Sequence, residues 1–278
     1  MFENRKLVIS TQHEKEKVIA PILEKFLGVT CVTPTKFNTD MLGSFSGEIP
    51  RQDDAITTAR KKCLMGMEEL GCNLGIASEG SFGMHPSAFF IPANQEVLMF
   101  IDRKNNLEIT AQVISTETNF SGEEITSLKA LHEFCERVKF PSHAIIIKNT
   151  KENFNFVEKG INEPDQLEQV FNKCMQQYGK VYAETDMRAM YNPSRMKVIE
   201  QATMKLVEQI NSRCPACKTP GFSVLRYNPG LPCKICLYPT RSVLSCEYIC
   251  QKCNHTSMIE FPDNKYHEDP MYCDLCNP

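Results

Sequence analysis

The sequence predicts an α/β domain followed by a short cysteine-rich module. Short apolar segments alternate with amphipathic ones as far as residue 212, which is the pattern of strands and helices in an α/β fold. The pattern then changes, because nine of the fourteen cysteines lie in the last 65 residues and eight of these form C-x-x-C pairs. We therefore place the domains at residues 1–212 and 213–278.

The first half of the α/β domain is expected to contain two helices and six strands. An apolar stripe runs along the first helix, and Asp54 can cap the start of the second. The Asn105-Asn106 step suits a hairpin turn between two strands. The expected elements are strands at 5–10, 29–33, 73–77, 88–92, 96–102 and 107–117, helices ending near Leu27 and at Leu70, and a Gly-rich polar loop at 78–86.

The second half of this domain continues the alternation and ends in a long helix. Asn192 or Ser194 can cap that helix. The expected elements are helices at 121–138, 164–178 and 194–212 and strands at 143–148, 153–158 and 181–185.

Composition and charge limit the classes of function. A net charge of −3 and a pI near 6.1 argue against a protein that coats nucleic acid. Apolar runs stay well below the roughly 18 residues that a membrane span needs. The N-terminal residues do not resemble a signal peptide, and the remaining cysteines are isolated in apolar patterns, so a reducing cytoplasm is the expected location.

The C-x-x-C pairs have the spacing of zinc-ribbon ligands. The gaps between successive pairs are 15, 13 and 19 residues, and two pairs complete one four-sulfur site. Two structural zinc ions are therefore expected, and closed sites of this kind leave no open position for catalysis. The ligands would be Cys214, Cys217, Cys233, Cys236, Cys250, Cys253, Cys273 and Cys276.

The order of ligation admits two arrangements. Sequential ribbons, with pairs one and two on one zinc and pairs three and four on the other, are the preferred interpretation. A cross-braced arrangement joins pair one to three and pair two to four. A disulfide framework is the alternative to metal, and Cys246, His255 or His267 could replace one ligand.

Polar groups follow strands in three places where an α/β sheet commonly binds ligands. Thr11 and Lys15 lie in a strand-to-helix turn that suits phosphate. Arg60 and Lys62 follow on the next helix, and Glu48 precedes it. Glu79 comes directly after a strand and could hold Mg²⁺ or activate water. Alternatively, the basic residues lie on solvent-exposed faces of their helices, and the Glu79 carboxylate accepts hydrogen bonds from backbone N–H groups of its own turn.

A fourth polar stretch, Thr185-Asp186-Met187-Arg188-Ala189, connects a strand to the last long helix. Asp186 and Arg188 could form an ion pair that fixes this corner. In the functional interpretation Arg188, with Arg195, adds phosphate contacts.

The N-terminal motifs resemble the inosine/xanthosine triphosphate pyrophosphatase superfamily. They read S-T-Q-H-E-K, T-T-A-R-K-K and G-I-A-S-E-G here, beginning at Ser10, Thr57 and Gly75. The resemblance implies an inosine triphosphatase-like mixed sheet, with Thr11 and Lys15 in the phosphate turn and Glu79 near a metal. Gln12 stands where the family has Asn, and Thr57-Thr58 where it has Glu-Asn, so Glu48 would take the place of the missing metal ligand.

The whole chain more closely resembles a bacterial domain-of-unknown-function family. The shared motifs are G-x-F-x-G-E-x-P-R, G-I-A-S-E-G-S-F-G-x-H-P, T-D-M-R-A and paired C-x-x-C ending in C-N-P. They stand here at Gly43–Arg51, Gly75–Pro86, Thr185–Ala189 and Cys273–Pro278.

Two functions remain open from the sequence. The first is a Mg²⁺-dependent hydrolase, similar to a nucleoside triphosphate pyrophosphatase, that acts on a nucleotide or another phosphorylated small molecule. Lys15, Glu48 and Glu79 would then be catalytic, and Thr11, Lys15, Arg60, Lys62 and Arg188 would bind phosphate. The alternative is a non-enzymatic protein whose zinc ribbons bind nucleic acid or protein.

Overall fold

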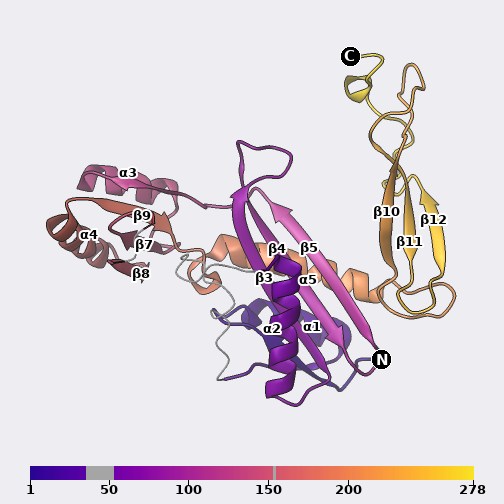
Figure 1. Ribbon diagram of the computed structural model, residues 1–278, viewed down its shortest axis with the longest axis horizontal. Helices are drawn as coiled ribbons and strands as arrows, with labels where there is room; N and C mark the ends of the chain where they lie inside the picture. The colour runs from indigo at the N-terminus through magenta and orange to yellow at the C-terminus, as the bar shows by residue number, and fades with distance from the viewer. Residues whose placement is uncertain (36–52, 153–154) are drawn as a thin grey trace. The chain divides into compact units, whose positions relative to one another are not determined.

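The computed structural model describes residues 1–35, 53–152 and 155–278. The chain separates into two compact units, Met1–Leu206 (unit 1) and Val207–Pro278 (unit 2). The boundary falls inside helix α5 (Pro193–Asn211), so one continuous helix runs from the first unit into the second (Figure 1).

The larger sheet of unit 1 is mixed and has the strand order β2-β1-β3-β4-β5 (Figure 1). Strand β1 runs parallel to both of its neighbours, whereas β3, β4 and β5 form an antiparallel meander. Its elements are β1 (Lys6–Ser10), α1 (Glu16–Leu27), β2 (Thr30–Val32), α2 (Ala55–Glu69), β3 (Leu74–Met84), β4 (Pro92–Asp102) and β5 (Leu107–Ser115).

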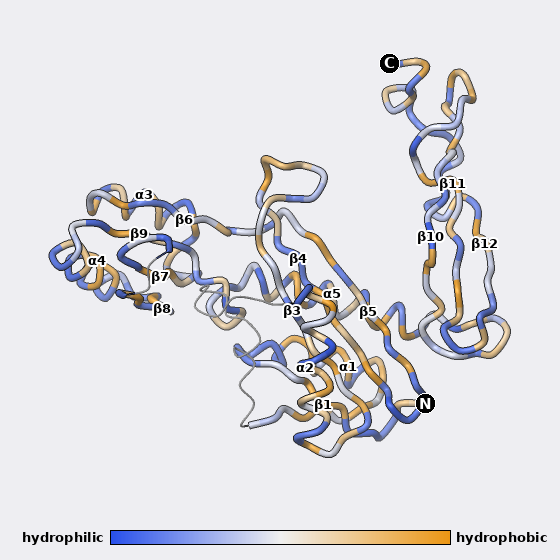
Figure 2. The backbone as a smooth tube through the Cα atoms, in the orientation of Figure 1, coloured by the Kyte–Doolittle hydropathy of each residue, from blue (hydrophilic) through white to orange (hydrophobic). Residues whose placement is uncertain are grey.

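Apolar side chains cover both faces of this sheet because helices pack on it. Cys63 and Met67 of α2 pack with Ala77, Met99 and Ile101. Helix α1 buries Ile19, Leu23 and Leu27. Figure 2 shows hydrophobic residues along β1 and the adjoining part of α1. Charged residues in buried strands need ion-pair or hydrogen-bond partners, and β3 and β4 contain such residues.

Strand β3 is longer than the sequence pattern predicts. The expected polar loop at 78–86 is wrong for most of its length, because the strand continues to Met84 and pairs with β4 as far as Pro92. The strand expected at 88–92 is also wrong, since β4 begins only at Pro92. Glycine and polar residues in β3 are stabilised by cross-strand pairing, which a single-sequence pattern does not reveal.

The second sheet of unit 1 has the order β6-β9-β7-β8 and is antiparallel. Its core includes Ile145, Phe134 and Phe171, contributed by β7 and by helices α3 and α4. The helix predicted from residue 121 is wrong at its start, because residues 122–125 form a strand and Ser127 caps α3. The elements are β6 (Gly122–Ile125), α3 (Leu128–Arg137), β7 (Ile145–Lys148), β8 (Val157–Ile161), α4 (Pro164–Tyr178) and β9 (Val181–Thr185).

Unit 2 is built on a three-stranded antiparallel sheet in the order β10-β11-β12. The strands are β10 (Ser223–Pro229), β11 (Val243–Ile249) and β12 (Thr256–Glu260). Its core cluster is small and consists of Cys214, Phe222 and Cys250, with Tyr248 packed against it.

Candidate functional site

The eight paired cysteines of unit 2 form two groups of four. The first group contains Cys214, Cys217, Cys250 and Cys253, and the second contains Cys233, Cys236, Cys273 and Cys276. In each group all four sulfur atoms lie within 4.8 Å of one another. Pair one therefore joins pair three, and pair two joins pair four. The sulfurs group as in the cross-braced alternative and not as in the preferred sequential assignment.

The strand topology explains this pairing. Pair one precedes β10 and pair three lies in the turn between β11 and β12, and the register places both at one end of the sheet. Pair two lies between β10 and β11, and pair four follows β12, so both belong to the opposite end. In an antiparallel meander every second connection returns to the same end, so alternate pairs meet.

Each four-cysteine group could hold one metal ion. The Cys217 and Cys250 sulfurs are 3.5 Å apart, and the Cys236 and Cys273 sulfurs are also 3.5 Å apart, which is compatible with ligands around one tetrahedral ion. Cys246 lies in β11 and belongs to neither group, and neither do His255 and His267. The arrangement is compatible with zinc.

Unit 1 holds a second candidate site, a cluster of buried charged residues. The turn between β1 and α1 contains two successive residues in the left-handed region, His13 at φ 67° and Glu14 at φ 62°. Such residues are uncommon outside glycine and often lie at functional sites. Lys15 follows them, and its Nζ donates to the Ser78 Oγ of β3 at 3.0 Å. The Lys15 side chain is almost fully buried.

Two buried ion pairs flank Lys15 on β3 and β4. On one face of the sheet the Lys62 Nζ donates to the Glu79 carboxylate at 2.6 Å. On the other face the Arg195 Nε donates to Glu96 at 2.7 Å, and both side chains are 0% exposed. Gly80 lies against this pair, because a Cβ there would be 2.3 Å from Arg195 and 2.4 Å from Glu96. A larger residue here would displace the Arg195–Glu96 pair from its position.

A third pair adds a half-buried cation to the group. The Arg188 guanidinium donates to the Asp186 carboxylate at 2.5 Å and lies over the Tyr191 ring. Asp186 is fully buried, and it also accepts a hydrogen bond from the Gly160 amide at 3.1 Å. Here the sequence-predicted pairing of Asp186 with Arg188 is confirmed.

The electrostatics show that these cations converge on one region. Burial, followed by the nearby charges of Lys15, Arg195, Arg188 and Lys62, lowers the pKa of His13 to about 3. Burial also lowers the pKa of Lys15 from 10.5 to about 7, with Arg195 acting in the same direction and Glu96 opposing it. His13 is therefore neutral at physiological pH, and Lys15 is poised between its charged and neutral forms.

The structure brings some of the predicted phosphate-site residues together and leaves others apart. Lys15, Lys62, Glu79 and Arg188 belong to the cluster. Thr11 lies beside it in the chain, buried, with its hydroxyl donating to the Gln12 carbonyl at 2.9 Å.

Two predicted residues are not part of this cluster. Arg60 pairs with Glu108 of β5 at 2.8 Å, and its side chain is 48% exposed. It lies on the solvent side of α2, whereas Lys62 lies on the buried side. Glu48 falls outside the described residues.

The cluster also contains residues that the sequence interpretation missed. They are His13, Ser78 and Glu96. Glu96 precedes the apolar run of β4, and a lone carboxylate there is the signal that could have indicated a buried ion pair.

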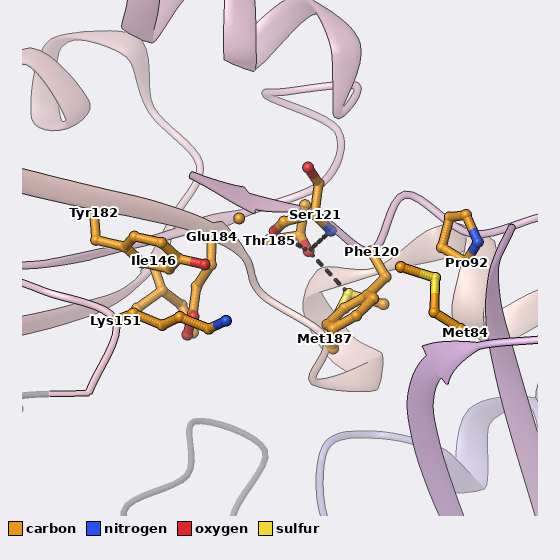
Figure 3. A pocket seen from close by; sticks show the side chains of 11 residues that line it. Met84, Pro92, Phe120, Ser121, Ile146, Lys151, Tyr182, Glu184, Thr185 and Met187 are labelled. Atoms are coloured by element: carbon orange, nitrogen blue, oxygen red, sulfur yellow. Dashed lines mark hydrogen bonds between the residues drawn. The ribbon is translucent and has the colours of Figure 1, made fainter. Parts of the chain in front are cut away.

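A pocket of about 430 Å³ lies elsewhere in unit 1 (Figure 3). Its wall comes from the ends of β3 and β4, from the segment before β6 and from strands β7 and β9. The lining is mainly apolar, with Tyr182, Glu184 and Lys151 grouped on one side (Figure 3).

These features define an α/β protein that carries two four-cysteine groups near its C-terminus, each of which could hold a metal ion. The family model described as Domain of unknown function (DUF6671) matches residues 62–278, and the chain belongs to this family. The resemblance to a domain-of-unknown-function family is thereby confirmed. The search of curated proteins found no match. Among the described helices, none combines the length and apolar character that crossing a bilayer requires.

Proposed function

We propose that the charged cluster of unit 1 binds the phosphate groups of a nucleotide or another phosphorylated ligand and that, with Mg²⁺, it hydrolyses this ligand. The observation that carries the proposal is the state of Lys15. This lysine is buried, yet its recorded hydrogen bonds go to the Ser78 hydroxyl and carbonyl, and no ion pair of the described residues includes it.

The charge balance of the cluster favours an anionic ligand. Lys62, Arg195 and Arg188 each have a carboxylate partner, so the three pairs are close to neutral. A protonated Lys15 adds one buried positive charge that hydrogen-bonds to Ser78 but forms no ion pair with a carboxylate of the described residues. An isolated buried charge is unfavourable, and a phosphate oxygen at the Lys15 ammonium would relieve this cost.

The Glu96 carboxylate of β4 supports a role for Mg²⁺. This ion typically binds through one or two carboxylates together with substrate phosphates and water. Glu96 has one buried oxygen, Oε2, without a hydrogen-bond partner among the described residues. Glu79 lies on the neighbouring strand and on the opposite face of the sheet, so Glu96 is the carboxylate that we propose for this ion. The bound ion would neutralise developing charge and orient the attacking water.

For unit 2 we propose that each four-cysteine group holds one structural zinc ion. Four thiolates within reach of one tetrahedral ion are the usual donor set of structural zinc, and they leave no coordination position for a substrate. Metal analysis of the purified protein should return two zinc ions per chain.

The hydrolase proposal is tested by release of phosphate or pyrophosphate from a panel of nucleoside triphosphates with Mg²⁺. We expect turnover of at least one nucleotide, and loss of at least about tenfold in kcat/KM in Lys15→Met, since one charge-assisted hydrogen bond to phosphate contributes about 1.5–3 kcal/mol. Lys17→Met is the matched control, because Lys17 lies two residues after Lys15, is exposed and pairs with Glu14.

Two results would overturn this proposal. If no nucleotide or simple phosphate ester is hydrolysed, the catalytic part is wrong. If sulfate and pyrophosphate also bind equally to the wild type and to Lys15→Met, the cluster is not a phosphate site.

A further inference from the structure

We infer that the pocket between the ends of β3 and β4 and the second sheet binds a planar heteroaromatic ring that carries N–H donors, of the nucleobase class. The pocket is separate from the cysteine groups, and none of its lining residues belongs to the proposed phosphate cluster. With a volume of about 430 Å³ it is large enough for a small molecule.

The apolar walls suit the faces of a flat ring. Phe120 and Tyr182 supply aromatic surface, and Met84 and Met187 supply polarisable thioethers. Aromatic side chains stack on bases, and methionine sulfur interacts favourably with aromatic rings. Figure 3 shows the Met84, Phe120 and Met187 side chains close together on one side of the pocket.

Polar groups on the other side suit the ring edge. The Glu184 carboxylate pairs with the buried Lys148 at 2.6 Å, and it forms no other hydrogen bond or ion pair within the described ranges. Burial raises the pKa of this carboxyl group, although Lys148 opposes the shift. Its second oxygen can accept from a ring N–H. Lys151, on the same side in Figure 3, can donate to a ring carbonyl or nitrogen.

A close backbone contact shapes this polar side. A Cβ on Gly122 would lie 2.6 Å from the Tyr182 hydroxyl oxygen, so only glycine lets the Tyr182 ring occupy its observed position. Tyr182 is itself largely buried. The pocket thus combines a fixed aromatic wall with a carboxylate beside it, and an aliphatic chain could not donate to the second oxygen of that carboxylate.

The pocket is connected to the charged cluster through contacts made by Phe82. Phe120 stacks on Phe82 with ring centroids 5.7 Å apart, and the Arg195 guanidinium lies 5.3 Å from the Phe82 ring centroid. Arg195 also donates to the Met187 carbonyl at 2.5 Å. One ligand that places a base in the pocket and phosphate at Lys15 would be a nucleotide. This last step rests on the proposed function, whereas binding of the base alone does not.

The test uses nucleosides, which carry a base but no phosphate. Adenosine, guanosine, cytidine and uridine are titrated into the full-length protein by calorimetry. We expect saturable binding of at least one of them, weakened about tenfold in Phe120→Ala, because a stacked aromatic contributes about 1–3 kcal/mol per base. Phe26→Ala is the matched control, since Phe26 is 44% exposed on α1 and Phe120 is 40% exposed.

A second pair of variants tests the polar side. Glu184→Gln should weaken nucleoside binding, and Glu123→Gln, which alters an exposed carboxylate on β6 paired with Arg137, should not. Lys15→Met should leave nucleoside binding unchanged, so a failure of the phosphate site is distinguishable from a failure of the pocket. The inference is overturned if no nucleoside binds saturably to the folded wild type, or if Phe120→Ala and Glu184→Gln both bind as the wild type does.

Discussion

At the scale of single residues, Lys15 is the most informative group in unit 1. Its folded-state pKa of about 7 lies below the ordinary value of 10.5, because burial disfavours the ammonium ion. The unfolded chain therefore binds more protons between these two values. Below pH 7 Lys15 is protonated in both states, and its burial lowers the free energy of unfolding by the full amount. This free energy rises as the pH increases from 7 towards 10.5.

The affinity for an anion at Lys15 should depend on whether the Lys15 side chain is protonated. We predict that sulfate, whose charge is constant over this range, binds about tenfold more weakly at pH 8 than at pH 6, because most Lys15 side chains lose their proton in between. Calorimetry at the two pH values measures the ratio. His13 contributes nothing to it, since its pKa of about 3 keeps it neutral throughout.

Lys15→Met provides the control for this measurement. The variant should bind sulfate weakly at both pH values and with little difference between them. An affinity for sulfate that is equal at pH 6 and pH 8 in the wild type would contradict the role given to Lys15.

Part of this site was predictable from sequence for a simple physical reason. Glu79 closely follows an apolar segment and Lys15 lies in the polar turn after another, and residues that follow such segments collect at one edge of an α/β sheet. Glu96 was missed because it lies 17 residues after Glu79, and its closeness depends on the register that pairs it with Gly80. Arg60 was assigned wrongly to the same group as Lys62, since two positions on a helix face different sides.

At the scale of elements, strand pairing decides most of what the sequence pattern left open. Residues 78–84 look like a loop because they contain two glycines and several polar groups, yet β4 pairs with all of them. The strand at 122–125 was read as the start of a helix, although its pairing with β9 stabilises the extended form. Helices α2 and α4, by contrast, follow from periodicity and caps that are local in sequence.

The same argument applies to the cysteine groups. Their ligands were predictable from spacing, but the partner of each pair depends on how many strands separate them. One strand lies between successive pairs, so successive pairs lie at opposite ends of the sheet. Counting the apolar segments between the pairs would have indicated the cross-braced arrangement from the sequence.

Double substitutions distinguish the two arrangements by metal stoichiometry. Cys214→Ser with Cys250→Ser removes two ligands of one group, so the protein should retain one zinc per chain. Cys214→Ser with Cys233→Ser removes a ligand from each group, and it should retain none or bind both weakly. Sequential ligation predicts the reverse result for both variants, so mass spectrometry of the native protein decides between them.

At the scale of the whole molecule, the two units depend on different sources of stability. Unit 1 buries large apolar clusters in two sheets, including fourteen fully buried residues around β7 and β9. The core cluster of unit 2 contains three buried residues, of which two are cysteines of one metal-binding group. A segment with so small a core is expected to need the proposed zinc ions in order to fold.

Removing the metal should therefore unfold one unit and leave the other folded. We predict that a strong chelator makes residues beyond about 207 sensitive to limited proteolysis, while a fragment close to Met1–Leu206 survives. The surviving protein should still bind sulfate, since that site lies wholly in unit 1 and uses side chains rather than the chelated ions. Mass spectrometry of the fragments and calorimetry of the chelated full-length chain check the two parts. If chelation instead exposes both units to cleavage, the metal ions stabilise unit 1 as well, and the separation of roles between the two units is wrong.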